Sequence, residues 1–332
     1  NKIKTKYNGV IMSNKDALTK KYVRTGDECI VPAAKNPAYA SRFDSVQLQS
    51  EPDFGDLGVV IDWQYISSEA VVVPFQKADC EHYITVIGGD FQNQLELTGE
   101  IEFTIGLSPD ELHSVKFNAA ATMHVQKGVY YAVRLVKLRN PDLPPIFNDC
   151  AFVKYGGSAV DPQRFEWLKS FSYGDAVWNR FHPHPEVVLS STMTLSRSFE
   201  NAAPMRRCWM PISEPFSMEI KSHYHEFDQY LEFHGTDPKN PKSLGGTIEF
   251  TIGDTEDTME KFTVTEATQF LVKRKLYHSP LVFAKVDDPA KPILMSEISF
   301  ASSYDRSAEI GAEGQLSEYE LFAEKMKKEG LR

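Results

Sequence analysis

Three histidines have a spacing that suits the ligands of one metal ion. His223 and His225 lie two residues apart in the segment His-Tyr-His-Glu-Phe-Asp-Gln, and His278 lies in a later segment, Lys-Leu-Tyr-His-Ser-Pro-Leu. Residues two apart in an extended strand point to the same face, so His223 and His225 would present two imidazoles side by side. Imidazole is a ligand for Zn, Cu, Fe and Ni. The spacing alone also allows two exposed histidines and one histidine in the core.

Gln229 has the same strand parity as His223 and His225. On a straight strand it lies too far along to reach the same ion, so it becomes a ligand only if the chain bends. The apolar run around His278 predicts another strand, which must bring this histidine to the first two.

An internal repeat indicates two domains of similar fold. Residues 99–106 (Gly-Glu-Ile-Glu-Phe-Thr-Ile-Gly) match residues 246–253 (Gly-Thr-Ile-Glu-Phe-Thr-Ile-Gly) at seven of eight positions. Flanking segments follow in the same order, with 83–89 matching 230–236 and 127–130 matching 275–278. With 332 residues the chain is long enough for two domains. We expect an N-terminal domain over 1–160 and a C-terminal domain over 161–332, with a junction at 156–186.

Short segments rich in β-branched and aromatic residues alternate with Gly, Pro, Asp and Asn, which predicts an all-β protein. A short helix is indicated near 15–22. The segment 317–326 is typical of an amphipathic C-terminal helix, because Ser317 and Glu320 form a capping-box pattern. The expected strands are 58–65, 70–75, 82–87, 100–105, 112–117, 121–126, 129–137, 151–154, 187–194, 206–212, 216–221, 229–234, 246–252, 260–264, 268–272, 277–286 and 293–300.

Composition excludes several classes of protein. The net charge of −10 disfavours a general binder of nucleic acid or of anionic membranes, both of which favour basic surfaces. No apolar run is long enough to span a bilayer, and the first residues lack the apolar segment of a signal peptide. The scattered cysteines predict free thiols in a reducing compartment. We therefore expect a cytoplasmic protein without nucleic-acid or membrane partners.

The second domain resembles the cupin superfamily. The first cupin motif has an HxH pair, an acidic or amide residue four positions later and then a glycine, here His223, His225, Gln229 and Gly235; a second motif ends in a histidine, here His278. The resemblance implies a small barrel of two facing antiparallel sheets with one divalent metal ion held by the three histidines and Gln229. With the repeat, the chain resembles a bicupin. The expected fold is all-β, with two tandem double-stranded β-helix (jelly-roll) barrels and a short C-terminal helix.

Two features depart from the family pattern. The usual glutamate is Gln229, a neutral ligand that leaves more positive charge on the ion and favours an anionic substrate. Lys273, Arg274 and Lys275 replace the usual Pro-x-Gly. These three residues either place cations at the mouth of the pocket or form a solvated basic hairpin.

The first repeat lacks most of the ligands. Its corresponding positions are Gln76, Ala78, His82 and Tyr130. With one imidazole left, we expect no metal there. This copy is then a structural half or a barrel that holds a ligand without metal.

The leading hypothesis for function is a metal-dependent enzyme acting on a small organic molecule, foremost a dioxygenase, with isomerase, lyase and hydrolase as alternatives. Fe is the first expectation for the metal, and Mn, Ni, Cu and Zn are the others. Two further hypotheses are a non-catalytic ligand-binding module and a structural bicupin. The resemblance also implies a homodimer.

Candidate catalytic residues come from adjacency and strand parity. Tyr230 and Tyr277 are next to predicted ligands, and Glu219 shares parity with His223 if that strand is continuous. Other polar residues that could line the second barrel are Glu232, His234 and Glu297.

Overall fold

The structure is a computed structural model. It describes residues 4–7, 10–26, 30–31, 45–49, 59–152, 168–170, 192–195, 205–219, 221–237, 239–240, 242–301 and 307–310. The predicted C-terminal helix (317–326) and most of the predicted junction (156–186) lie outside these residues and stay predictions. Within the described part of the chain, no helix is both long and apolar enough to cross a membrane.

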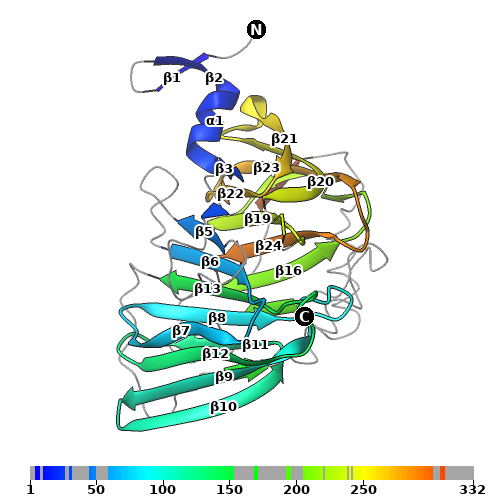
Figure 1. Cartoon of the computed structure of the whole chain (residues 1–332). Coiled ribbons are helices and arrows are strands. Elements are labelled where there is room, and N and C mark those ends of the chain that lie inside the picture. Colours follow the sequence, from blue (N-terminus) through cyan, green and yellow to red (C-terminus); the bar gives the residue numbers. More distant parts are fainter. Residues whose placement is uncertain are drawn as a thin grey trace, which may run out of the picture.

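The N-terminal half forms a barrel of two antiparallel sheets, which lies in the lower part of Figure 1. One sheet has the strand order β10-β9-β12-β7, and the core of the other has the order β11-β8-β13-β6. The bounds are β6 Val59–Tyr65, β7 Ala70–Lys77, β8 Glu81–Ile87, β9 Glu96–Ser108, β10 Glu111–Ala119, β11 Ala121–Val125, β12 Tyr130–Leu138 and β13 Ile146–Phe152; β4 Ile30–Val31, β5 Ser45–Gln49 and β14 Leu168–Ser170 extend the second sheet.

The C-terminal half repeats this order, with β21-β20-β23-β18 in one sheet and β22-β19-β24-β16 in the other. The bounds are β16 Arg206–Ile212, β17 Phe216–Glu219, β18 Ser222–Tyr224, β19 Gln229–Gly235, β20 Ser243–Gly253, β21 Glu260–Glu266, β22 Thr268–Val272, β23 Tyr277–Val286 and β24 Ile293–Ser299; further elements are β1 Lys4–Tyr7, β2 Val10–Ser13, β3 Val23–Thr25, β15 Thr192–Leu195, β25 Ser307–Ile310 and the 3-10 turn η5 Glu256–Thr258. The expected all-β pair of jelly-roll barrels is therefore confirmed.

The repeated sequence builds the same wall in both barrels. In β9, Ile101, Phe103 and Ile105 are buried and alternate with partly exposed polar residues, and β20 has the same pattern. Such alternation is typical of a strand with one face on the core and one toward solvent. The strand predicted at 151–154 instead begins at Ile146. Asn148 and Asp149, which disfavour strands, are tolerated there because both have hydrogen-bonding partners.

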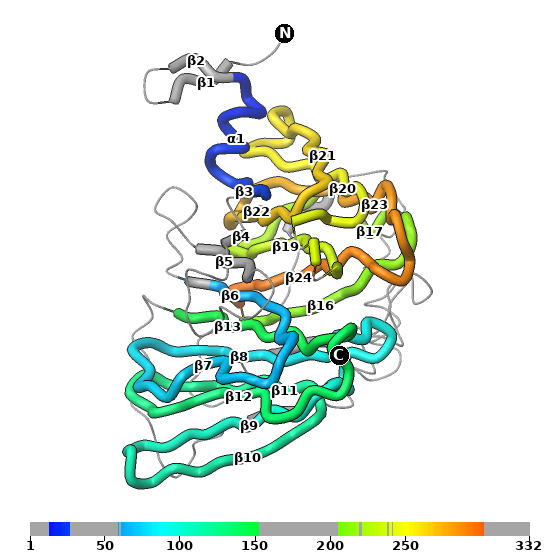
Figure 2. Tube along the Cα trace, viewed as in Figure 1, coloured from blue at the N-terminus to red at the C-terminus, as the bar shows by residue number. Residues whose placement is uncertain are grey.

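The two barrels pack through the sheets that contain β13 and β16, which lie next to each other in both views (Figures 1 and 2). Arg207 of β16 is fully buried there. Its guanidinium donates to Asn148 of the first barrel, to Glu232 at 3.0 Å and to Ser296 at 3.0 Å, and it lies 4.3 Å from the Trp209 ring centre. Burial would raise the pKa of Glu232, but the charge of Arg207 outweighs this and lowers it.

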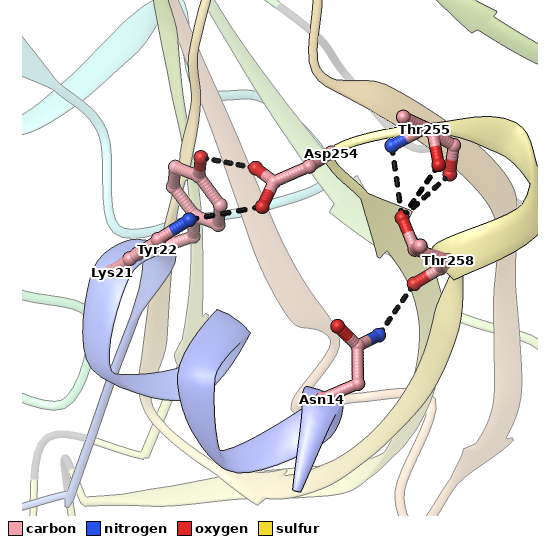
Figure 3. A network of polar contacts seen from close by, with 6 residues as sticks. All are labelled: Asn14, Lys21, Tyr22, Asp254, Thr255 and Thr258. Carbon is pink, nitrogen blue, oxygen red and sulfur yellow. Dashed lines mark hydrogen bonds and ion pairs between the residues drawn. The ribbon is translucent and has the colours of Figure 1, made fainter. Parts of the chain in front are cut away.

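The N-terminal segment crosses to the second barrel. Helix α1 (Asn14–Tyr22) confirms the helix predicted near 15–22, and the following strand β3 pairs with β22. Figure 3 shows how the helix is held: the Asp254 carboxylate accepts from Tyr22 at 2.6 Å and pairs with Lys21 at 2.9 Å, while Asn14 donates to the Thr258 carbonyl. The predicted boundary at residue 160 stays a prediction, and residues 14–25 belong in space with the C-terminal barrel.

The buried Arg207–Glu232 pair should be a strong determinant of stability. We expect Glu232→Gln to lower the free energy of unfolding by about 3–5 kcal/mol, because the guanidinium stays buried without a counter-charge. Glu249→Gln is the matched control, since Glu249 pairs with Lys261 on the exposed face of the same barrel and should cost about 1 kcal/mol or less. Urea unfolding of both variants measures the difference, and equal small losses would contradict the prediction.

Candidate metal centre

The three predicted histidines meet inside the C-terminal barrel. His223 of β18 is the direct cross-strand partner of His278 on β23, and His225 follows β18. The imidazole ring centres are 4.2 Å apart for His223 and His278, 5.0 Å for His223 and His225, and 4.9 Å for His225 and His278. One ligand atom from each lies within 4.8 Å of the others, and all three residues are at most 3% exposed. The alternative of two exposed histidines is therefore wrong.

Backbone hydrogen bonds orient two of the rings. His223 Nδ1 lies 3.1 Å from the Lys221 carbonyl, and His278 Nδ1 lies 3.0 Å from the Leu276 carbonyl. A carbonyl only accepts, so each Nδ1 carries the proton and each Nε2 carries a lone pair. Histidine ligands of metal ions are held in this way by a bond from the second ring nitrogen. Two nitrogens about 2.1 Å from one ion lie up to about 4.2 Å apart, so the observed grouping needs little adjustment to bind a divalent metal.

Aromatic residues contact two of the three histidines. Phe227 stacks on His225 with ring centres 4.7 Å apart, and Phe250 lies 6.2 Å from His278. Phe250 is part of the apolar core of this barrel. The three histidines are at most 3% exposed, and a site so shielded from bulk water strengthens the electrostatic interactions within it.

Gln229 lies on the inner face of β19, the same face as Leu231 and Phe233, which belong to the core of this barrel. Its amide is 3.4 Å from the Ser299 hydroxyl, which donates to Glu297 at 2.6 Å. A 180° rotation of the amide lets Nε2 donate to Ser299 and turns Oε1 the other way, as a ligand oxygen requires. The fourth predicted ligand thus points into the barrel that holds the histidines.

A buried ion pair supports this end of the barrel. Arg206 of β16 lies opposite Ser299 in the sheet and donates to Glu297 at 2.9 Å. Arg206 was missed in the sequence because its strand is buried along its whole length and shows no alternation. Glu297, predicted to line the barrel, does face inward.

The candidate catalytic residues are not gathered at the histidines. Tyr230 lies in the core between the barrels, where its ring is 5.8 Å from Phe300. The rings of Tyr277 and Tyr224 have centres 5.2 Å apart. Tyr277 is the neighbour of His278 in β23, so its side chain points to the face of the strand opposite His278. Of Glu219 the structure describes the backbone, at the end of β17. The catalytic roles of all three residues stay predictions. In this structure the side chains of Tyr230 and Tyr277 point away from the three histidines.

Two other sets of polar residues also have definite places. Glu232 and His234 face the layer between the barrels, with His234 stacked on Trp63 of the first barrel at 4.5 Å. They do not line the second barrel, because residues of β19 at even numbers point away from its interior.

Arg274 and Lys275 are exposed and pair with Glu226. This arrangement matches the solvated basic hairpin rather than cations lining a pocket.

The register of the strands corrects one assignment in the first barrel. His278 pairs with Ile252, and Ile252 corresponds to Ile105 in the repeat. Ile105 pairs with Tyr131, so Tyr131 and not Tyr130 takes the place of His278. The assignment was wrong by one residue because the turn before this strand differs between the repeats. Gln76, at the place of His223, donates to the Tyr131 hydroxyl at 3.0 Å.

His82, which takes the place of Gln229, makes contacts that its motif did not predict. Its Nδ1 lies 2.9 Å from Asp149 Oδ2, and its Nε2 lies 3.5 Å from Cys80 Sγ. Burial alone would lower the pKa of His82, but the charge and hydrogen bond of Asp149 outweigh it and raise the pKa to about 11. Asp149 and Cys80 were missed because neither lies in a motif position.

Comparisons with known proteins agree with this architecture. No family model matches the sequence, and no curated protein is similar to it in sequence. A structure of Bacillus subtilis oxalate decarboxylase that concerns its Mn(II) centers is 9% identical, with a TM-score of 0.53, over 80% of this chain and 75% of that chain. A second oxalate decarboxylase structure, on the substrate binding mode, is 8% identical with the same TM-score and coverage. The chain therefore has the bicupin fold that its sequence indicated.

Metal content should depend on the three histidines. We expect protein purified without chelator to carry about one equivalent of divalent metal, and His223→Ala and His278→Ala each to lose it, because a site with only three strong ligands tolerates no loss among them. His113→Ala, at an exposed histidine of the first barrel, is the control and should retain the metal. Elemental analysis measures all four proteins, and equal metal in every one would contradict the assignment.

The His82–Asp149 pair should make stability depend on pH. His82 has a higher pKa in the folded chain (about 11) than its ordinary value of 6.5. The pair's contribution is therefore complete below pH 6.5 and is lost as the pH rises through about 11. We expect the loss of stability in His82→Gln, measured by urea unfolding, to shrink across this range. In an Asp149→Asn background the same substitution should show a much weaker dependence on pH.

Proposed function

We propose that the C-terminal barrel is the active site of a divalent-metal-dependent enzyme that acts on a small organic acid. The observation that carries this proposal is the convergence of three buried imidazoles, two of them oriented by backbone carbonyls, in an apolar enclosure. A site with only a structural role would normally be closed by four strong ligands, whereas catalytic sites keep a position for substrate or water. Here the fourth candidate is the neutral amide of Gln229.

The residues of this chain have separable tasks. His223, His225 and His278 would hold the ion, with Gln229 as a weaker ligand. When bound, a divalent ion binds and polarises substrate oxygens and supports redox or Lewis-acid chemistry. Phe227 and Phe250 exclude water from the histidines.

Charge favours an acidic substrate. Three neutral imidazoles and an amide leave the charge of the ion uncompensated, so a carboxylate is the natural additional ligand. Arg206 adds a second cation inside the barrel, although Glu297 neutralises it. The low exposure of the histidines restricts the substrate to a small molecule.

Two reaction classes are candidates. Oxygenation follows from the sequence resemblance and an open metal site. Decarboxylation, a lyase reaction, is favoured by the likeness to oxalate decarboxylase, and that protein's Mn(II) centers make Mn the first metal to test, ahead of the Fe expected from the sequence. A homodimer remains a prediction from the resemblance.

The test is turnover by the metal-loaded chain. Protein reconstituted with Mn(II) or Fe(II) is incubated with small mono- and dicarboxylic acids, oxalate included, while O₂ uptake and CO₂ release are followed. We expect activity that chelation removes and that His278→Ala lowers by at least about a hundredfold, since loss of a ligand removes the ion. O₂ consumed in proportion to product identifies an oxygenase, and CO₂ without net O₂ use identifies a decarboxylase. Turnover that survives metal removal would refute the proposal.

A further inference from the structure

The first barrel places a thiol, an imidazole and a carboxylate in a row. Cys80, in the turn before β8, has its sulfur 3.5 Å from His82 Nε2, and the other ring nitrogen of His82 lies 2.9 Å from Asp149 on β13. This connectivity of nucleophile, base and orienting group is the one that activates cysteine and serine nucleophiles in enzymes. Backbone hydrogen bonds between Ala78 and both Gly128 and Val129 fix the turn that carries the thiol.

The row occupies the place that the metal site has in the second barrel. His82 corresponds to Gln229. Asp149 pairs with Ile84, two residues after His82, and Glu297 pairs with Leu231, two residues after Gln229, so the two carboxylates correspond as well. Gln76 and Tyr131, hydrogen-bonded to each other, stand where the second barrel has His223 and His278. The first barrel has therefore exchanged imidazole ligands for a different set of reactive groups.

We propose that Cys80 is the nucleophile of a second, metal-independent site that reacts with small hydroperoxides, with His82 as proton donor and Asp149 as the residue that orients His82. This site goes beyond the function proposed for the C-terminal barrel and does not depend on it. Asp149 holds a proton on His82, whose pKa is about 11, so a proton donor lies beside the sulfur that attacks the hydroperoxide.

Hydroperoxides fit the chemistry and the access. Cys80 is 5% exposed and His82 is 8% exposed, so only a small reagent can reach the sulfur. Hydroxide and alkoxide are poor leaving groups and need a proton, which His82 Nε2 supplies next to the sulfur. The thiolate forms an S–O bond as the O–O bond breaks; sulfur is oxidised to sulfenic acid, and the departing oxygen takes the His82 proton and leaves as water or an alcohol. Two equivalents of a small thiol then restore Cys80 and release a disulfide and water.

A metal ion held by Asp79, Cys80 and His82 is the competing arrangement, since their ligand atoms lie within 4.8 Å of one another. An imidazolium has no lone pair for a metal, and Asp79 is exposed. The ion pair with Asp149 therefore works against metal binding at this site.

The experiment measures sulfenic acid at each cysteine of the full chain. Protein is treated with hydrogen peroxide, trapped with dimedone and mapped by mass spectrometry, with Cys150 and Cys208, both fully buried, as internal controls. We expect Cys80 to react at least about tenfold faster than either, and His82→Gln or Asp149→Asn to slow it about tenfold. His124→Gln removes the other histidine–carboxylate pair of this barrel, with Glu81, and should leave the rate unchanged.

A second measurement needs no variant. The rate of Cys80 alkylation by iodoacetamide is compared with that of Cys208, and we expect Cys80 to react at least about tenfold faster, because its sulfur contacts His82. A rate equal to that of Cys208, or stoichiometric Zn²⁺ binding that blocks labelling and is lost in Cys80→Ser, would overturn the proposal. The last result would make this a metal site instead. None of these readouts depends on the three histidines of the second barrel, so the two proposals fail separately.

Discussion

The whole arrangement depends on two sheets that are buried on both faces. Strands β8, β16, β19 and β24 are buried along their entire length, because one face of each lines a barrel and the other packs against the opposite barrel. Successive residues of a strand point to opposite faces. Each of these strands therefore supplies one set of side chains to a site and another set to the interface, and neither set can shift without the other.

Adjacent arginines illustrate the division. Arg206 faces the second barrel and pairs with Glu297, while Arg207 faces the first barrel and pairs with Glu232. The interface pair is fully buried and hydrogen-bonded to both barrels, so it fixes how they meet. A shift of one residue in the register of β16 would exchange the two arginines, put an unpaired charge in each environment and misplace Ser299 and Gln229.

Duplication let the two barrels diverge at equivalent positions. The second barrel has three imidazoles. The first barrel has Gln76 and Tyr131 at the places of two of them, and a thiol, an imidazole and a carboxylate in contact beside these residues. The apolar Ile-x-Phe-x-Ile strand remained the same in both because it fills the same space. Packing thus explains why β9 and β20 are similar in sequence. The two barrels differ instead in the reactive side chains that point into them.

The sequence by itself determined the repeat, the strand-rich fold and the three histidines, since HxH spacing and period-two alternation are local properties of the chain. It could not assign faces in the strands that are buried on both sides, because such strands carry no polar alternation. For this reason Tyr230, Glu232 and His234 were expected inside a barrel and are found between barrels. Only the tertiary structure brought Asp149 to His82, since 67 positions separate the carboxylate from the imidazole and the pairing of β8 with β13 makes them neighbours.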